Sequence, residues 1–292
     1  MKGLDLSTLE LKTGKNYVSH SAMSTWLNCG WQYYLSRIQH VPEAPSWWLV
    51  GGKAVHKCTE IYDIEFHGTD KVFETSNVFQ DVWDMEFAQS DNGMPFRAGG
   101  RATKAYPNKE DNTWWLAEGP KQVDTWIQWR EESGYEMFKL PDGDIAVETE
   151  LNYAIHGVQV KGYLDRLMVS PDGELTVIDI KTSAKEPATN TQLGIYAIMV
   201  EKMIGVRPSK GAYFMTRTGE LSIPTGLDMY TENRFGSWLK GFEIAIDNNI
   251  FIPAPGFMCG TCSVNNACYA VNGRDSHLYP EITITEGDTD NE

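Results

Sequence analysis

Residues 147–183 read VETELNYAIHGVQVKGYLDRLMVSPDGELTVIDIKTS, and this stretch decides the fold. Val, Ile, Leu and Tyr alternate with polar residues in three segments, which is the pattern of half-buried strands. We therefore expect three neighbouring strands, at Ile145–Ile155, Val158–Val169 and Glu174–Lys181. A helix follows them and extends to about Val200.

Two turns set the register of these strands. The pair His156-Gly157 predicts a two-residue turn, which places Glu148 opposite Asp165. The segment 171–173, Pro-Asp-Gly, predicts a type I turn closed by a left-handed glycine, which places Asp165 opposite Asp179. Three carboxylates then stand in a row across three strands. Because like charges about 5 Å apart destabilise a sheet, the row calls for an explanation.

A divalent cation would resolve this repulsion, since Mg²⁺ and Mn²⁺ prefer carboxylate and carbonyl oxygens. Lys181 follows Asp179 by two residues and shares its face of the strand, while Ile178 and Ile180 point into the core. Acids and a lysine around a metal suit phosphodiester hydrolysis. The alternative is an ordinary solvated hairpin face whose register brings the acids together by chance.

The segment Ile178-Asp179-Ile180-Lys181, preceded by Asp165 and followed by Gln192 and Tyr196, resembles the PD-(D/E)XK nuclease superfamily. More narrowly it resembles the RecB-like branch, which includes the CRISPR-associated exonucleases and the AddB nuclease domain. Gly162-Tyr163-Leu164-Asp165 stands where other branches have Pro-Asp. The resemblance implies an α/β fold of the restriction-endonuclease type, with a mixed central sheet flanked by helices.

The resemblance also implies roles for individual residues. A helix opened by glycines carries Gly52-x-x-x-His56 and then Glu60, and the family places a metal-binding histidine there. The implied metal ligands for Mg²⁺ or Mn²⁺ are His56, Asp165, Asp179 and the carbonyl of Ile180. The implied catalytic residues are Asp165, Asp179, Lys181, Gln192, Tyr196 and Glu148. Without the resemblance, Gln192 would be an exposed polar residue and Tyr196 a half-buried core residue.

Three of the five cysteines follow a compact spacing, Cys259-x2-Cys262-x5-Cys268. Close cysteines in a reducing compartment indicate a metal site rather than disulfides. In the iron–sulfur members of the family the fourth ligand lies at the position of Cys29, inside a helix expected from Ser19 or Ser21 to about Ile38. Four thiolates suit zinc or a [4Fe–4S] cluster, and the resemblance favours the cluster as a clasp. Cys58 is expected to be a buried free thiol.

The composition is that of an ordinary soluble globule, 41% hydrophobic and 22% charged over 292 residues. We expect one nuclease domain over residues 1–280 and an acidic, disordered tail over 281–292. No apolar run approaches the roughly 20 residues of a membrane span, and no signal peptide opens the sequence, so we expect a cytoplasmic protein without membrane contact. The net charge of −15 predicts weak, salt-sensitive binding to nucleic acid.

Residues 66–139 are less informative. The stretch RAGGRATKAYPNKEDNTWW, residues 97–115, interleaves basic and aromatic residues, which suits single-stranded DNA. A glycine-rich surface loop anchored by its Trp pair is the alternative. Residues 119–133 predict a helix, residues 210–225 a hairpin and residues 232–248 an amphipathic helix.

Taken together, these features predict a metal-dependent DNA exonuclease that acts on single-stranded ends in recombination, repair or DNA processing, with recombination or CRISPR-type proteins as possible partners. Two alternatives stay open on the same site: a structure-specific endonuclease and an accessory nuclease of a larger complex. A third is a non-catalytic iron–sulfur protein that binds DNA.

Overall fold

The computed structural model describes residues 6–281. Within them, contacts between Cα atoms define two compact units, one of residues 17–20 and 44–239, the other of residues 6–16, 21–43 and 240–281. The predicted single domain over residues 1–280 stays a prediction. The predicted acidic tail lies outside the described residues from position 282 onward.

The larger unit is built on a mixed sheet of seven strands with the order β1-β3-β4-β5-β6, in which β2 also pairs with β3 and β7 with β5. Only β4 and β5 run parallel; every other pair in this sheet is antiparallel. The strands are β1 Glu136–Met137, β2 Val147–Ile155, β3 Val158–Val169, β4 Leu175–Lys181, β5 Lys210–Met215, β6 Glu220–Leu221 and β7 Thr225–Gly226. The predicted mixed α/β architecture is therefore confirmed.

The two predicted turns and their registers are also confirmed. Ile155 pairs with Val158 across a turn in which His156 and Gly157 both have positive φ, 49° and 84°. At the next turn the Ser170 N–H donates to the Glu174 carbonyl, and Gly173 has a φ of 84°. Left-handed backbone of this kind is the geometry that tight hairpins require.

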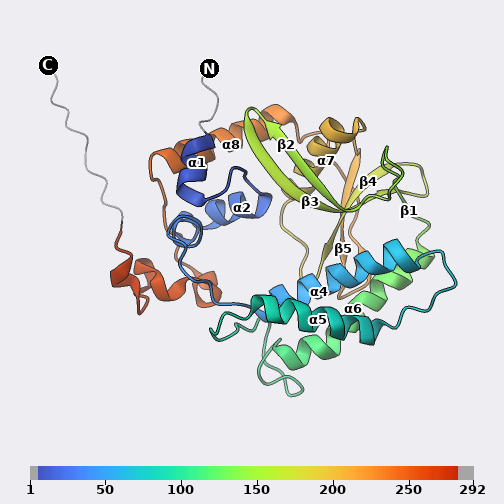
Figure 1. Cartoon of the computed structure of the whole chain (residues 1–292), viewed down its shortest axis with the longest axis horizontal. Helices are drawn as coiled ribbons and strands as arrows, with labels where there is room; N and C mark the ends of the chain where they lie inside the picture. The colour runs from blue at the N-terminus through green and yellow to red at the C-terminus, as the bar shows by residue number, and fades with distance from the viewer. Residues whose placement is uncertain (1–5, 282–292) are drawn as a thin grey trace. The chain divides into compact units, whose positions relative to one another are not determined.

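Helices α4, α5 and α6 pack side by side against one another in this unit (Figure 1). They are α4 Trp47–Ile61, which continues into a π-helical segment η2 Tyr62–Phe66, then α5 Thr75–Ser90 and α6 Asn112–Glu132. The sequence placed the glycines of α4 before the helix, whereas Gly51 lies inside it. A Cβ at Gly51 would stand 2.0 Å from the Trp115 ring, so the missing side chain lets α4 and α6 approach. The predicted helix at 119–133 in fact begins at Asn112, because Asp111 caps it by accepting the Trp114 N–H.

The central sheet separates two apolar layers. On one face Ile178, Ile180 and Phe214 pack with Tyr62 and Trp126 from the helical layer. Helix α7, Thr191–Ile204, contacts β2, β4 and β5, and its residues 193–200 are all buried. The amphipathic helix predicted at 232–248 is α8, Glu232–Asp247.

The smaller unit contains short helices. They are α1 Leu6–Thr13, the greater part of α2 His20–Asn28, α3 Gly30–Tyr33, the π-helical η1 Tyr34–Ile38, and 3-10 turns at Phe257–Thr261, Asn265–Ala267, Tyr269–Val271 and Ser276–Leu278. The single helix predicted over this region is wrong in one respect, because the chain breaks at Cys29. That residue is extended, with φ −162°, and caps α3 by accepting the Gln32 N–H at its sulfur. No helix among residues 6–281 has both the length and the apolar character needed to cross a membrane.

Candidate active site

The sheet register brings three acids to one end of the strands. Val147 pairs with Arg166 and Thr149 with Leu164, and continuing this register sets Glu148 opposite Asp165. The β3–β4 ladder likewise sets Asp165 opposite Asp179, though its last regular pair is Arg166 with Ile178. Glu148 itself has a φ of +45°, an uncommon backbone conformation for a residue with a side chain.

Past the last regular β3–β4 pair, the Asp165 side chain accepts the backbone N–H that a strand carbonyl would otherwise accept. Its Oδ2 accepts the N–H of Ile180 at 2.7 Å, which fixes the carboxylate beside β4. Asp165 is 7% exposed and Asp179 only 1% exposed. Asp179 therefore does not lie on an open strand face, because helix α7 packs against β4.

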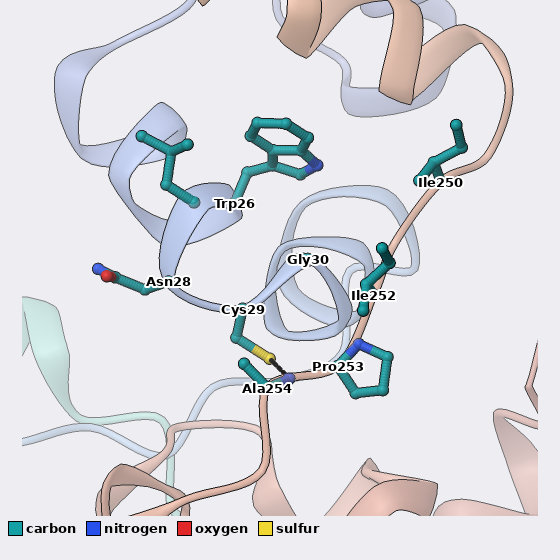
Figure 2. Close-up of a pocket in the computed structure, with 9 residues that line it drawn as sticks. Trp26, Asn28, Cys29, Gly30, Ile250, Ile252, Pro253 and Ala254 are labelled. Atoms are coloured by element: carbon teal, nitrogen blue, oxygen red, sulfur yellow. Dashed lines mark hydrogen bonds between the residues drawn. The ribbon is translucent and has the colours of Figure 1, made fainter.

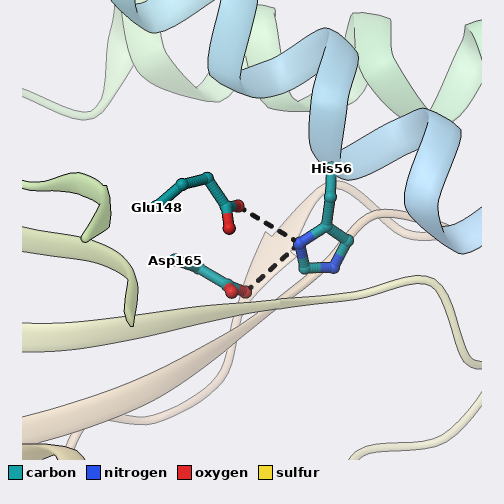
Figure 3. Close-up of side chains that lie close together, drawn as sticks. All are labelled: His56, Glu148 and Asp165. Atoms are coloured by element: carbon teal, nitrogen blue, oxygen red, sulfur yellow. Dashed lines mark ion pairs between the residues drawn. The ribbon is translucent and has the colours of Figure 1, made fainter. Parts of the chain in front are cut away.

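His56 of α4 completes a compact group with two of these acids. Its Nδ1 lies 3.5 Å from Glu148 Oε1 and 3.5 Å from Asp165 Oδ2 (Figure 3). The three ligand atoms lie within 4.8 Å of one another, and among the described residues no other set of three His, Cys, Asp or Glu does so. The helix and both strands thus present a nitrogen and two oxygens at the spacing that one cation needs.

The charges at this group are strongly perturbed. Burial raises the pKa of Asp165 to about 7, with Asp179 and Glu148 adding to the effect and His56 opposing it. Burial alone would lower the pKa of His56, but the neighbouring carboxylates outweigh it and raise that pKa to about 9. Such a group holds protons tightly because its negative charges lack enough partners.

A second chain of contacts runs from Asp179 to α7. The Lys181 Nζ lies 2.5 Å from Asp179 Oδ2, an ion pair that does not have hydrogen-bond geometry, so this buried oxygen accepts no hydrogen bond. The same Nζ donates to Gln192 Oε1 at 3.0 Å, and Gln192 Nε2 donates to the Tyr196 hydroxyl at 3.2 Å. The Tyr196 ring lies against Gly162, where a Cβ would approach its Cε1 to 2.8 Å. All six residues implied as catalytic are therefore brought to one end of the sheet.

Arg166 is a buried residue that the sequence did not single out. It is 0% exposed, its guanidinium reaches Asp63 of η2, and its Nη1 donates to the Asp165 carbonyl at 2.7 Å. Its Nε donates to Asp63 Oδ2 at 2.7 Å and its Nη2 to the Thr59 hydroxyl at 3.0 Å, while Nη1 lies 3.4 Å from Glu148 Oε1. The guanidinium thus ties the helix that carries His56 to the strand that carries Glu148.

The same network is closed from α6. Asp63 also accepts Arg130 Nε and Trp126 Nε1, each at 3.0 Å, so this buried acid receives donors from three residues. The sequence carried one usable signal, because an arginine inside a predicted strand and next to Asp165 must point to the core face. A buried arginine requires a paired acid, but nothing in the run IYDIEF marks Asp63 as that partner.

His20 is a second residue missed by the sequence. It is half-buried at the first position of α2, in the same unit as the carboxylates. Burial and the charge of Lys181 lower its pKa to about 4, against the opposing effect of Asp179. A neutral imidazole therefore stands near the Asp179–Lys181 pair at neutral pH.

The cysteines belong to the smaller unit, and their sulfurs accept backbone N–H groups. Cys29 Sγ accepts from the Gln32 N–H at 3.5 Å. It also accepts from the Ala254 N–H at 3.4 Å (Figure 2). Cys259 Sγ accepts from Gly256 at 3.3 Å. Cys29 also lies in the wall of a cavity of about 250 Å³ that is mostly apolar.

The other two sulfurs follow the same pattern. Backbone N–H groups of Val264, and of Ala270 and Val271, lie near the sulfurs of Cys262 and Cys268 respectively and act to lower the pKa of each thiol. Burial raises the pKa of Cys262, and the charges of the other three thiols raise it further. The four cysteines therefore lie close enough to influence one another's ionisation.

These cysteines nevertheless do not form a compact cluster. Within residues 6–281 no three cysteine sulfurs lie within 4.8 Å of one another, whereas four thiolates on one zinc would be about 3.8 Å apart for Zn–S bonds of about 2.3 Å. The predicted iron–sulfur clasp is thus not supported by the sulfur positions. The reason is local, since Cys259 follows the loose chain 248–256 and no regular helix or strand fixes it. Cys58 is a buried thiol, as expected.

Residues 17–269 match the family model described as the PD-(D/E)XK nuclease superfamily. The Gene 69 protein of Mycobacterium phage D29 is 30% identical over 272 residues, covering 86% of this chain and 95% of that protein. The Gene 69 protein of Mycobacterium phage L5 is 28% identical over 291 residues, with the same coverage. The crystal structure of SSO0001 matches 76% of this chain and 97% of its own at 15% identity, but with a TM-score of 0.35, too low to carry an argument.

Proposed function

The chain belongs to the PD-(D/E)XK nuclease superfamily, and we propose that it is a DNA exonuclease whose site holds Mg²⁺ or Mn²⁺. The superfamily implies a nucleic acid substrate. The observation that carries the proposal is the convergence of His56, Glu148 and Asp165 within 4.8 Å, beside the Asp179–Lys181 pair. Repelling acids gathered around one histidine suit a metal-dependent nuclease, because a bound cation would offset their repulsion.

The donor set fits a hard divalent cation. Two carboxylate oxygens and an imidazole nitrogen converge, and burial together with the charges of Asp179 and Glu148 raises the pKa of Asp165, a repulsion that a cation would offset. The Ile180 carbonyl and the unbonded Oδ2 of Asp179 are the further ligands that we propose. When bound, the cation supplies a Lewis acid that offsets phosphate charge and makes a nearby water more acidic.

The remaining residues position the substrate. Lys181 holds the scissile phosphate and orients the attacking water, because it carries a mobile positive charge next to Asp179. Gln192 fixes the Lys181 ammonium through its Oε1 and is itself fixed by the Tyr196 hydroxyl. Gln192 and Tyr196 lie on one face of α7, so this helix sets the direction from which the DNA strand enters the site.

The preference for single-stranded ends and a role in recombination, repair or DNA processing rest on the resemblance to the RecB-like branch. A structure-specific endonuclease and an accessory nuclease within a recombination or CRISPR-type complex remain the second candidates, because the same site would serve each of them. The net charge of −15 favours weak contacts with DNA in all three cases.

One experiment tests this function. End-labelled linear single strands, closed circular single strands of the same sequence and an RNA strand are incubated with the protein and Mg²⁺, Mn²⁺ or EDTA. We expect the linear DNA to shorten from an end, the circles to survive and EDTA to stop the reaction. Circles cut at a similar rate would move the assignment to an endonuclease. Binding without cleavage of DNA or RNA, by folded protein in either metal, would favour the non-catalytic alternative.

We also propose a metal–thiolate centre at Cys29, Cys259, Cys262 and Cys268. The support is the set of backbone N–H groups that bond to the sulfurs of Cys29 and Cys259 and lie near those of Cys262 and Cys268, since such groups stabilise ligating thiolates. Between zinc and a [4Fe–4S] cluster, the cluster follows from the resemblance to the iron–sulfur members of the RecB-like branch. Its role would be to hold the smaller unit in one conformation.

A further inference from the structure

The segment between α5 and α6 concentrates positive charge in an acidic protein. Residues 92–109 contain Arg97, Arg101, Lys104 and Lys109 and no Asp or Glu, whereas the whole chain carries a net charge of −15. Arg101, Lys104 and Lys109 are exposed, and no ion pair joins them to a carboxylate within residues 6–281. We call residues 98–109 the basic loop.

The basic loop is held in one shape by its own hydrogen bonds. The Thr103 N–H donates to the Tyr106 carbonyl at 3.0 Å, and the Tyr106 N–H donates back to the Thr103 hydroxyl at 3.0 Å. The Tyr106 hydroxyl donates to Glu118 of α6 at 3.0 Å. A ligand that meets this loop therefore does not have to order it first.

The base of the loop is fastened next to the active site. Gly99 pairs with Glu110, and the Glu110 carboxylate accepts two hydrogen bonds from Arg217, at 2.7 and 2.9 Å. Arg217 Nε in turn donates to the carbonyl of Thr182 at 2.7 Å. Because Thr182 directly follows Lys181, this bridge anchors the loop at the end of β4 where the proposed phosphate-binding lysine lies.

The acids around the loop already have partners. Glu110 is paired with Arg217, Asp111 accepts the Trp114 N–H at the start of α6, and Glu118 pairs with Lys121 at 2.9 Å. None of these carboxylates neutralises the loop cations, so the loop keeps its positive field.

The two tryptophans of this stretch have protein partners, which favours the alternative of a surface loop anchored by its Trp pair over base stacking on them. Trp115 is fully buried, and Trp114 lies under the guanidinium of Arg217 at 4.7 Å. Trp48 is similarly covered by Arg97, at 4.8 Å. Exposed cations remain without exposed rings, which suits contact with phosphates rather than with bases.

We propose that Arg101, Lys104 and Lys109 bind phosphates of the nucleic acid strand whose scissile bond lies at the active site. The inference rests on the proposed nuclease function and adds the surface along which the strand runs. Such contacts are independent of sequence and depend on salt. Each single-strand contact contributes about 0.7 to the slope of log K against log [salt], or about fivefold in affinity at 0.1 M relative to 1 M salt. Three contacts are thus worth about a hundredfold.

The test measures binding of a fluorescein-labelled 30-nucleotide thymidylate strand by anisotropy in EDTA, across a range of salt. The neutral variant is Arg101→Ala/Lys104→Ala/Lys109→Ala. A matched control, Lys71→Ala/Lys139→Ala/Lys240→Ala, removes the same charge from other exposed positions, and Arg101→Lys/Lys104→Arg/Lys109→Arg keeps the loop charge. Melting temperatures establish that each variant is folded.

We expect the neutral variant to bind about 100-fold more weakly at 0.1 M salt, with a slope reduced by about 2. The matched control and the charge-keeping variant should bind like the wild type. Equal weakening of the matched control, wild-type binding by the neutral variant, or a wild type that does not bind the strand would overturn the proposal. The nuclease function is scored separately, by whether the wild type cleaves DNA with Mn²⁺, so either can fail alone.

Discussion

The carboxylate site and the cysteine segment both resemble metal centres in sequence, yet they differ in how far the fold prepares them. His56, Glu148 and Asp165 come from a helix and two paired strands, and their ligand atoms already converge within 4.8 Å. The cysteines come from a helix cap and from 3-10 turns, and their sulfurs do not converge to that distance. A helix and paired strands can hold repelling ligand atoms close together without a metal. Ligands carried by turns need the metal itself to draw them to coordination distance.

The largest effect should come from the carboxylate site. Asp179→Asn and Lys181→Met should each lower metal-dependent cleavage by about 10³-fold or more, since each removes a charge at the reacting phosphate. Cleavage rates with Mn²⁺ measure the loss. Asp179→Asn keeps the shape of the side chain and relieves the repulsion with Asp165, which offsets the lost ion pair with Lys181, so melting should be little changed. Retained wild-type cleavage in either folded variant would remove that residue from the site.

The next test asks whether the buried network prepares this site. Arg166→Met leaves Asp63 and Glu148 short of a cation and should cost about 3–5 kcal/mol of stability, because breaking a buried pair strands a charge. Urea unfolding measures it. The control is Lys121→Met at an exposed pair with Glu118, which should cost much less stability because solvent screens that pair. A comparable small loss in both variants would mean that the network does not support the fold.

The stability of the cysteine segment should depend on its metal, so that each ligand substitution acts by releasing the metal. Anaerobically purified protein should contain about four irons per chain, the content of one [4Fe–4S] cluster. Serine at Cys29, Cys259, Cys262 or Cys268 should abolish iron and lower the melting temperature, while Cys58→Ser should keep the iron. Protein with one zinc and no iron would replace the cluster by a zinc site. Metal-free protein that melts like the wild type would refute a thiolate centre altogether.

The smallest effect concerns protons at the carboxylate site. Asp165 and His56 have folded pKa values of about 7 and about 9, both above their ordinary values of 3.8 and 6.5, so the folded state binds more protons than the unfolded state. The contribution of His56 is full below about pH 6.5 and disappears as the pH passes about 9, and ionisation of Asp165 opposes folding from about pH 4 to 7. In EDTA these two groups should therefore lower stability as the pH rises.

Thermal melts in EDTA and in Mg²⁺, from pH 5 to pH 9, check this expectation. The cation competes with the same protons, so it should raise the melting temperature more at pH 9 than at pH 5. The variant His56→Gln/Asp165→Asn should lose most of this difference. An equal metal-induced shift at both pH values would contradict the assignment of these ligands.

The sequence predicted the sheet and the acids well because turns are local. Two short turns fixed both registers, and from them the alignment of Glu148, Asp165 and Asp179 followed by counting. Burial of the acids was not predicted, since it depends on how α7 packs, and Gly162 permits that approach without any mark in the sequence. The Asp63–Arg166 pair joins residues 103 positions apart, which no spacing rule reaches.

Helix boundaries failed for a related reason. The break at Cys29 depends on a sulfur that accepts backbone N–H groups from Gln32 and Ala254, and the second donor is 225 residues away. A periodic run of apolar residues gave no reason to end the helix there. In the basic loop the charges were visible in the sequence, but the covering of Trp114 by Arg217 depends on tertiary contact.

The left-handed backbone at Glu148 has a consequence for how this protein can evolve. A residue with a side chain costs about 1–2 kcal/mol in that conformation, a cost that glycine would avoid. Selection for thermal tolerance alone therefore favours loss of Glu148, while selection for cleavage retains it. If cleavage were no longer under selection, replacement of Glu148 would relieve this backbone strain and would give a more stable but inactive protein.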